Sequence, residues 1–276
     1  MLQKKQEVSS MYAIDYHIHS HHSFDGRESI RDICRAAIAR GRDEIAITDH
    51  LDIYSGRAFE QDLDAGACFA EIEEARREFA GRLVIKSGIE MGQPQANPDE
   101  ARRFFEKYSP DFVIGSIHNL DNDFDIYYSD WPNTDEFALF SRYLDWLTDL
   151  AENWDFDVMG HVTYPLRYIF EARGTRFPLE NYWERFEQLF RILVSRGRGI
   201  ECNTSGFFQK INDSLPPLEL LRLFRDCGGE IVTVGSDAHR LEQVSATVDR
   251  GEELLRRAGF EYICTFTQRK AQFHRL

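Results

Sequence analysis

The chain has 276 residues, 42% of them hydrophobic, which is enough for one large or two ordinary domains with an apolar core. Its formal net charge of −14 argues against nucleic acid as a partner, because phosphate backbones are bound by excess lysine and arginine, but a small phosphorylated substrate stays possible. No apolar run approaches the roughly 20 residues that span a bilayer, and the polar start of the chain does not have the pattern of a secretory signal, so no membrane association is expected.

The cysteines indicate a reducing compartment. They are odd in number, form no CxxC pair and are scattered over positions 34, 68, 202, 227 and 264. A disulfide framework is therefore not expected, and we predict a cytoplasmic protein. For the oligomeric state, a monomer and a homodimer both remain open.

Strands and helices are predicted to alternate along the chain. Short apolar runs predict strands at 11–16, 44–48, 83–89, 112–117, 156–160, 199–202 and 231–235. Amphipathic segments with helix start and stop signals predict helices at 29–40, 67–80, 98–107, 134–152, 180–196, 216–227 and 241–258, followed by a short tail.

Seven strand–helix repeats without a linker predict a parallel sheet wrapped by helices. We therefore expect an α/β fold, a distorted (β/α)7 TIM-like barrel, in which residues 11–276 form a single domain behind an N-terminal tail of residues 1–10. A flat, doubly wound sheet is the alternative. It usually has a glycine-rich phosphate loop after the first strand, and this sequence has none.

Potential metal ligands follow almost every predicted strand. Two of them, His17 and His19, are two residues apart, so an extended strand would point them to the same side. The others, just past later strand ends, are His50, Glu90, His118, His161, Asp237 and His239. In a barrel these positions converge at the C-terminal face. Any one of them could be structural, but together they exceed what one ion needs, and the mixture of imidazole and carboxylate suits Zn²⁺, Fe²⁺ or Mn²⁺.

These residues lie in motifs that resemble those of the PHP (polymerase and histidinol phosphatase) superfamily. The motifs are His17-Ile-His19-Ser, Thr48-Asp-His50, Gly88-Ile-Glu90, Gly115-Ser-Ile-His118, Gly160-His161 and Gly235-Ser-Asp237-Ala-His239. The resemblance extends from about residue 12 to 260 and implies a metallophosphoesterase with three divalent metal ions (Zn, Fe or Mn).

The resemblance also implies how the ligands divide among the ions. The implied ligands of the first ion are His17, His19, Glu90 and Asp237, and those of the second are Glu90, as a bridge, His118 and His161. The third ion would be held by Asp25, His50 and His239, although some members of the superfamily carry histidine where this chain has Asp25.

Within the superfamily, the segments 23–26, 155–161 and 200–206 are similar to the histidinol-phosphate phosphatases. The implied reaction is hydrolysis of L-histidinol phosphate to L-histidinol and phosphate, with a metal-bridged hydroxide attacking phosphorus. The implied catalytic residues are Asp25, Glu90 and His239, and the implied substrate contacts are Arg167, Asn203 and Ser205. Arg167 falls where that branch places an arginine that contacts the substrate phosphate.

Four alternatives to this function remain. A PHP phosphoesterase could act on another small phosphate or nucleotide. An exonuclease or polymerase-associated domain is disfavoured by the net charge, and a non-catalytic metal scaffold by the complete set of donors. A barrel amidohydrolase usually has a bridging lysine where this chain has His118.

Other residues give weaker signals. His21 and His22 are expected to be exposed loop residues or substrate contacts, and His274 a solvated residue of the tail. Tyr127 and Tyr128, in a long acidic loop, belong either to a lid over the substrate or to the core.

Overall fold

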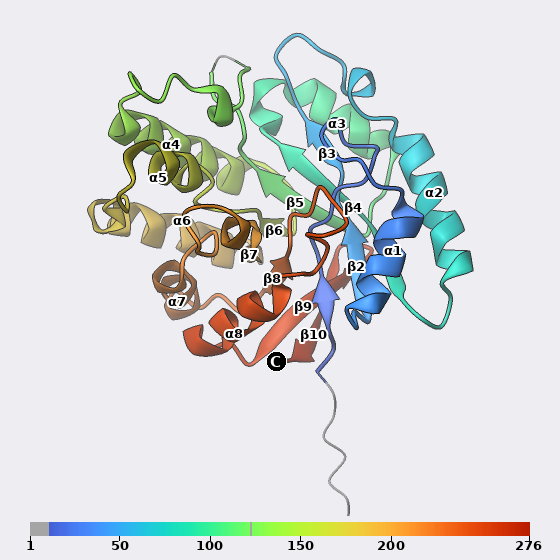
Figure 1. Cartoon of the computed structure of the whole chain (residues 1–276). Helices are drawn as coiled ribbons and strands as arrows, with labels where there is room; N and C mark the ends of the chain where they lie inside the picture. Colours follow the sequence, from blue (N-terminus) through green and yellow to red (C-terminus); the bar gives the residue numbers. More distant parts are fainter. Residues whose placement is uncertain (1–10, 122) are drawn as a thin grey trace, which may run out of the picture.

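A parallel barrel occupies the centre of the molecule, and helices surround it (Figure 1). This computed structural model describes residues 11–121 and 123–276, so the predicted tail of residues 1–10 lies outside the described part. The strands are β1 (Ile14–Asp15), β2 (Glu44–Ile47), β3 (His50–Asp52), β4 (Val84–Gly92), β5 (Phe112–Ser116), β6 (Val158–Met159), β7 (Gly199–Asn203), β8 (Val232–Gly235), β9 (Tyr262–Thr267) and β10 (Lys270–Arg275). The helices are α1 (Ile30–Ala39), α2 (Ala65–Glu78), α3 (Pro98–Lys107), α4 (Glu136–Asn153), α5 (Leu166–Arg173), α6 (Trp183–Ser195), α7 (Leu218–Asp226) and α8 (Val248–Ala258).

The strand order confirms the predicted barrel. The parallel strands are neighbours in the order β1-β2-β4-β5-β6-β7-β8. The short strand β3, which was not predicted, also pairs with β4 and places His50 opposite Glu90, so β2 and β3 are two parts of one interrupted barrel strand. The ring closes between β1 and β8, where Tyr16 N donates to Val234 O at 2.9 Å and a bridge joins Ile18 to Ala238.

Helices α1, α2, α3 and α4 each begin after a residue whose side chain caps the helix. Ser29 accepts a hydrogen bond from the backbone of Asp32 at the start of α1, and Asp135 caps α4 in the same way.

Two predictions about the helices were wrong. Helix α5 was missed, because its eight residues lie in the segment between two predicted elements, where a loop was expected. Helix α8 begins at Val248, since residues 241–247 form turns instead of the predicted first two turns of helix.

The predicted short tail is an antiparallel hairpin, β9–β10, across the N-terminal end of the barrel. Phe266 packs against Phe112 with ring centroids 4.9 Å apart, and its backbone nitrogen donates to the Tyr16 hydroxyl at 2.8 Å. His274 was predicted to be solvated, which is wrong: its ring stacks on Tyr12, with centroids 4.2 Å apart. The aromatic and β-branched composition of residues 262–267 is a strand signal that the prediction passed over.

The described helices do not include one that is long and apolar enough to cross a membrane.

Candidate metal centre

All nine predicted metal ligands meet at the C-terminal ends of the barrel strands. Each ligand lies on a strand end or on the loop that follows it: His17, His19, Asp25, His50, Glu90, His118, His161, Asp237 and His239. Most are buried, and Asp25 and His239 are the more exposed members, with side-chain exposures of 39% and 26%. The cluster therefore has a closed inner end and an open outer end.

The first group contains the two histidines that follow β1. The Nε2 atoms of His17 and His19 are 3.0 Å apart, and Oδ1 of Asp237 lies 3.7 and 3.4 Å from them. Glu90 approaches from β4, with its Oε2 atom 3.3 Å from His17 Nε2 and 3.5 Å from His19 Nε2. These four donors surround one point.

Glu90 joins this first group to a second. Its other oxygen, Oε1, lies 3.1 Å from His118 Nε2 and 2.8 Å from His161 Nε2, and these two nitrogens are 3.2 Å apart. The Ser116 hydroxyl donates to the same oxygen at 2.7 Å. The carboxylate of Glu90 thus spans two separate clusters of imidazole nitrogens.

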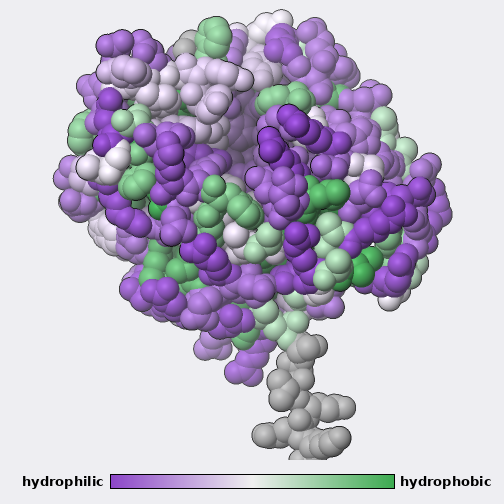
Figure 2. All heavy atoms as spheres, viewed as in Figure 1, coloured by the Kyte–Doolittle hydropathy of each residue, from purple (hydrophilic) through white to green (hydrophobic). Residues whose placement is uncertain are grey.

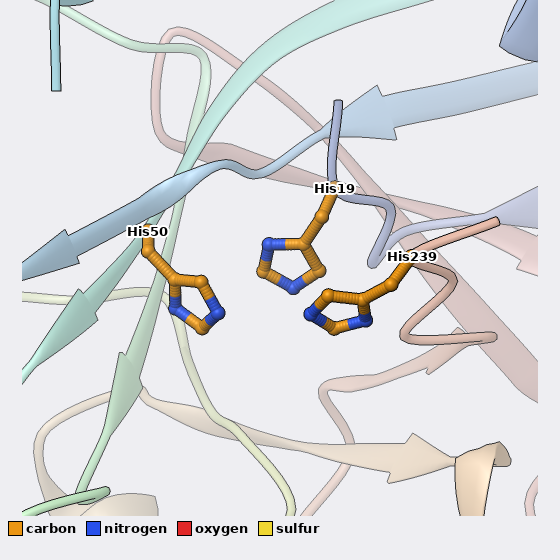
Figure 3. A group of neighbouring side chains, drawn as sticks. All are labelled: His19, His50 and His239. Atoms are coloured by element: carbon orange, nitrogen blue, oxygen red, sulfur yellow. The ribbon is translucent and has the colours of Figure 1, made fainter. Parts of the chain in front are cut away.

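The third group lies at the open end. Figure 3 shows the rings of His19, His50 and His239 turned toward one another, although they come from three different segments of the chain. Asp25 completes this group: its Oδ2 lies 3.1 Å from His239 Nε2, and its Oδ1 lies 3.7 Å from His50 Nε2.

Hydrogen bonds behind the cluster determine which nitrogen of each ring faces inward. Glu201 accepts from His17 Nδ1 at 2.7 Å, and Asp52 accepts from His118 Nδ1 at 3.0 Å. The carbonyl oxygen of residue 237 accepts from His239 Nδ1 at 3.0 Å. Because Nδ1 is the donor in each case, Nε2 of the neutral ring carries a lone pair that points into the cluster.

These donors fit divalent cations. The Nε2 atoms of neighbouring rings face one another at about the distance of a hydrogen bond, and buried Oε2 of Glu90 has no hydrogen-bond partner among the described residues. Such an arrangement is costly unless a positive charge lies among the donors. Imidazole together with carboxylate is a donor set suited to Zn²⁺, Fe²⁺ or Mn²⁺.

The electrostatics of the cluster are those of a cation site. Burial alone lowers the pKa of a histidine, but Glu201 and Glu90 outweigh it and raise the pKa of His17 well above its ordinary value. Burial and the nearby His239 lower the pKa of His19 to about 4. Burial would raise the pKa of Glu90, yet the surrounding histidines hold it well below its usual range, so the carboxylate stays ionised.

The backbone around Asp237 is shaped to present its carboxylate. Asp237 adopts φ +53°, a left-handed conformation that is uncommon for residues other than glycine and often found at functional sites. Two residues earlier, a Cβ atom on Gly235 would lie 2.4 Å from Cβ of His17 and 2.5 Å from Oε1 of Glu201. Only glycine leaves room there for His17 and the carboxylate that orients it.

A cavity of about 100 Å³ opens over the cluster. The space-filling view in Figure 2 shows the molecule hollowed on the side drawn in Figure 1, with mainly hydrophilic residues around the hollow. The cavity is lined by seven of the nine predicted ligands and by Phe24, Asp125, Tyr164, Arg167 and Tyr168.

Arg167, a predicted substrate contact, is buried in the wall of this cavity. Its guanidinium group lies over the Tyr164 ring, 4.4 Å from the centroid, and 5.6 Å from the Tyr168 centroid. Within the described part of the chain, two of its nitrogens, Nε and Nη2, have no hydrogen-bond partner, and Nη2 is 3.7 Å from Oδ2 of Asp237. A buried cation with unused donors beside the cluster is suited to bind an anion.

The other two predicted substrate contacts lie behind Asp237. The Asn203 amide and the Ser205 hydroxyl both donate to its Oδ2, at 3.2 and 3.1 Å. Their donors are therefore used to orient a carboxylate of the cluster.

Sequence reasoning missed the residues that hold the ligands in place and some that line the cavity. Glu201 and Asp52 were not singled out as functional, although an acidic residue inside an apolar strand is a signal for Glu201. Tyr164 and Phe24 line the cavity but are ordinary loop residues in the sequence. In the loop after β5, Tyr127 and Tyr128 are exposed, and Tyr127 contacts Tyr168 at the cavity wall.

Comparison with known proteins identifies the family. Residues 15–205 match the family model described as the PHP domain, and the chain belongs to this family.

Its relatives include phosphatases. A histidinol-phosphatase of Lactococcus lactis subsp. lactis (strain IL1403) is 32% identical over 270 residues, which cover 94% of this chain and 96% of the relative. A protein of Thermotoga maritima, named as a probable histidinol-phosphatase, is 25% identical over 91% of this chain and 94% of its own length. The crystal structure of histidinol phosphate phosphatase from Lactococcus lactis, complexed with zinc, L-histidinol and phosphate, superposes with a TM-score of 0.82 at 28% identity, covering 95% of this chain and 100% of that one.

Proposed function

We propose that this chain is a metal-dependent histidinol-phosphatase, which hydrolyses L-histidinol phosphate to L-histidinol and phosphate. The observation that carries the proposal is the convergence of nine metal donors at one end of the barrel, beside a cavity in which Nε and Nη2 of Arg167 have no hydrogen-bond partner among the described residues. The Lactococcus lactis relative, similar over nearly the whole chain, supports the choice of substrate.

The geometry supports a division of the donors among three divalent ions, Zn, Fe or Mn. We assign His17, His19, Glu90 and Asp237 to the first, Glu90, His118 and His161 to the second, and Asp25, His50 and His239 to the third. When bound, such ions activate water as a nucleophile at neutral pH and neutralise charge on a transferring phosphoryl group.

The chain's own residues bind and orient the phosphate ester. The Nε and Nη2 atoms of Arg167 would donate to the non-bridging oxygens of the phosphate, where charge-assisted hydrogen bonds are strongest. The rings of Tyr164 and Tyr168 hold the guanidinium at the cavity wall. Little rearrangement is therefore needed when the phosphate arrives, which is a condition for efficient stabilisation of the transition state.

Three of the proposed ligands are also the proposed catalytic residues. Glu90 holds the two inner groups at a fixed separation, because each of its oxygens faces a different pair of imidazoles. Asp25 and His239 form the open end, so the leaving oxygen of the ester would lie nearest to them.

Asn203 and Ser205 would act on the substrate through Asp237. Both hold its Oδ2 atom, which leaves Oδ1 facing His17 and His19. We therefore propose that their contribution to substrate binding is the orientation of this carboxylate.

The test is steady-state phosphate release by the purified protein loaded with Mn²⁺ or Zn²⁺. Histidinol phosphate is compared with p-nitrophenyl phosphate, a nucleoside monophosphate and a phosphodiester. We expect kcat/KM for histidinol phosphate to exceed the others by at least about 100-fold, equivalent to ~2.7 kcal/mol of transition-state discrimination. A flat profile, or a preference for the diester or the nucleotide, would overturn the assignment and indicate another PHP phosphoesterase.

A further inference from the structure

A second group of metal donors lies outside the nine-residue centre. His21 and His22 follow the first histidine pair in sequence, and both face Glu71 on helix α2. Oε2 of Glu71 is 3.4 Å from His21 Nε2 and 2.9 Å from His22 Nε2. Side-chain exposures of 42%, 12% and 27% for His21, His22 and Glu71 show that the group is reachable from solvent and partly sheltered.

The carboxylate of Glu71 is held in a fixed orientation. Its Oε1 atom accepts a hydrogen bond from the backbone nitrogen of Ile30 at 3.0 Å, and Ile30 is the first residue of α1. Backbone N–H groups at a helix start have no partner within the helix, so this bond satisfies one of them. The other oxygen, Oε2, is left to face the two histidines.

The histidines present their outer nitrogens to that oxygen. Nδ1 of His21 lies 3.3 Å from the backbone carbonyl oxygen of Glu28, which can only accept, so Nδ1 is the donor. In the neutral ring Nε2 then carries a lone pair, and it points toward a carboxylate oxygen. The ring of His22 lies beside that of His21, with centroids 4.3 Å apart, and its Nε2 converges on the same oxygen.

We propose that His21, His22 and Glu71 bind one divalent transition-metal ion, such as Zn²⁺, at a peripheral site separate from the nine-residue centre. Two imidazoles and one carboxylate, with open positions for water, form a common Zn²⁺ donor set. The neighbouring carbonyl of Glu28 and the start of α1 orient two of the ligands from behind, as is usual in metal sites.

An ion at this site would fasten the loop that leads to Asp25. The loop is closed by a hydrogen bond from His21 N to Glu28 O, at 2.9 Å, and by one from Ser23 N to Ser20 O, at 3.0 Å. The proposed site joins this loop to α2 and, through the Ile30 contact, to α1. It would therefore limit movement of the segment that carries Asp25 at the open end of the nine-residue centre.

The experiment measures Zn²⁺ stoichiometry by equilibrium dialysis and atomic emission on the untagged, full-length protein. The wild type is compared with the double variant His21→Gln/His22→Gln and with His274→Gln, a control in the distant hairpin. We expect the wild type and the control to bind one more equivalent than the double variant. Glu71→Gln, whose amide oxygen can still accept from Ile30, should bind the additional equivalent at least tenfold more weakly.

Hydrogen exchange locates the additional ion. Addition of Zn²⁺ beyond the amount that fills the nine-residue centre should slow exchange in residues 20–28 of the wild type and leave the double variant unchanged. Equal stoichiometry in the wild type and the double variant would overturn the proposal, as would protection that falls elsewhere in the chain. All variants keep the nine donors, so the result does not depend on which phosphate ester the protein hydrolyses.

Discussion

The two ends of the barrel differ in how their buried charged side chains are paired. At the N-terminal end, buried charged groups are satisfied by partners within the chain. Glu44 accepts from the hydroxyl of Tyr12 at 2.8 Å and from that of Tyr16, and Asp157 accepts from Val113 N at 2.8 Å and from Arg269 Nε at 2.6 Å. At the C-terminal end, carboxylates and imidazoles of the cluster face one another, and the fixed positive charge beside them is Arg167, whose Nη2 atom lies 3.7 Å from Oδ2 of Asp237.

The difference shows which end serves stability and which serves chemistry. A group whose charge is neutralised internally contributes to folding and has little capacity left for a ligand. The C-terminal cluster leaves lone pairs of His17 and His118 and one oxygen of Glu90 unsatisfied. This end therefore depends on bound cations, and Arg167 provides the one fixed positive charge among the described residues that line the cavity.

The sharpest test of this comparison removes one donor from the C-terminal end. Asp237→Ala should lower kcat/KM for the phosphate ester by at least about 10³-fold, equivalent to ~4 kcal/mol, because the proposed first ion loses a ligand. Metal content should fall in the same preparation, as measured by atomic emission. His274→Ala, which alters a histidine at the other end, should keep the wild-type rate. A fully loaded Asp237→Ala protein with normal activity would falsify the proposed centre.

The second prediction separates anion binding from metal binding. Arg167→Met should lower kcat/KM by about 10²–10³-fold, because a preorganised donor to the phosphate is lost. Metal content should not change, since Arg167 is not among the proposed ligands. Arg250→Met serves as the control, because Arg250 stacks on Phe207, 3.6 Å from the ring centroid, outside the cavity. If the Arg167 variant loses metal to the same extent as activity, its role is structural.

At the N-terminal end, substitution of an arginine should lower the stability of the fold and leave activity unchanged. Arg269→Ala removes the partner of Asp157, whose side chain is only 1% exposed, and should destabilise the protein by about 2–3 kcal/mol. Urea denaturation measures this loss, and activity per folded molecule should stay unchanged. Arg102→Ala, which breaks an exposed pair with Asp99, should have little effect on either quantity. A large loss of activity in the Arg269 variant under native conditions would show that the two ends are coupled.

The smallest predicted effect is a pH dependence of the free energy of unfolding. It arises from Glu252, on helix α8. Burial and the nearby Asp249 raise the pKa of Glu252 to about 7, although Arg42 opposes this shift. Between the unfolded pKa of about 4.5 and the folded value, the folded chain keeps a proton that the unfolded chain releases, so stability falls as pH rises through this range.

Comparison of Glu252→Gln with the wild type isolates this contribution. The variant cannot titrate there, so its free energy of unfolding relative to wild type should rise from pH 5 to pH 8 by an amount of the order of 2 kcal/mol. Urea denaturation at both pH values measures this difference in free energy of unfolding. The metal centre is the same in both proteins, so its own pH dependence cancels in the comparison. A constant difference, or one that falls with pH, would contradict the prediction.

The sequence by itself determined the fold class and the identity of the clustered donors. Seven short apolar runs alternating with amphipathic helices predict a parallel barrel, and parallel strands bring their C-terminal ends to one face. Residues at those ends, such as Glu90 and His118, were therefore predictable as neighbours from their positions in the chain. Strand β3 was not predicted from the sequence. This omission did not affect the predicted cluster, because His50 also lies just past the end of β2.

The tertiary structure decided how each donor is oriented and what lies behind it. The hydrogen bond between His17 and Glu201 joins residues 184 positions apart, and no local pattern specifies such a contact. The same holds for Asn203, whose amide group is directed at Asp237 by the packing of β7 beside β8. Sequence periodicity specifies which face a residue occupies, but which nitrogen of a ring is free depends on partners brought together only when the barrel closes.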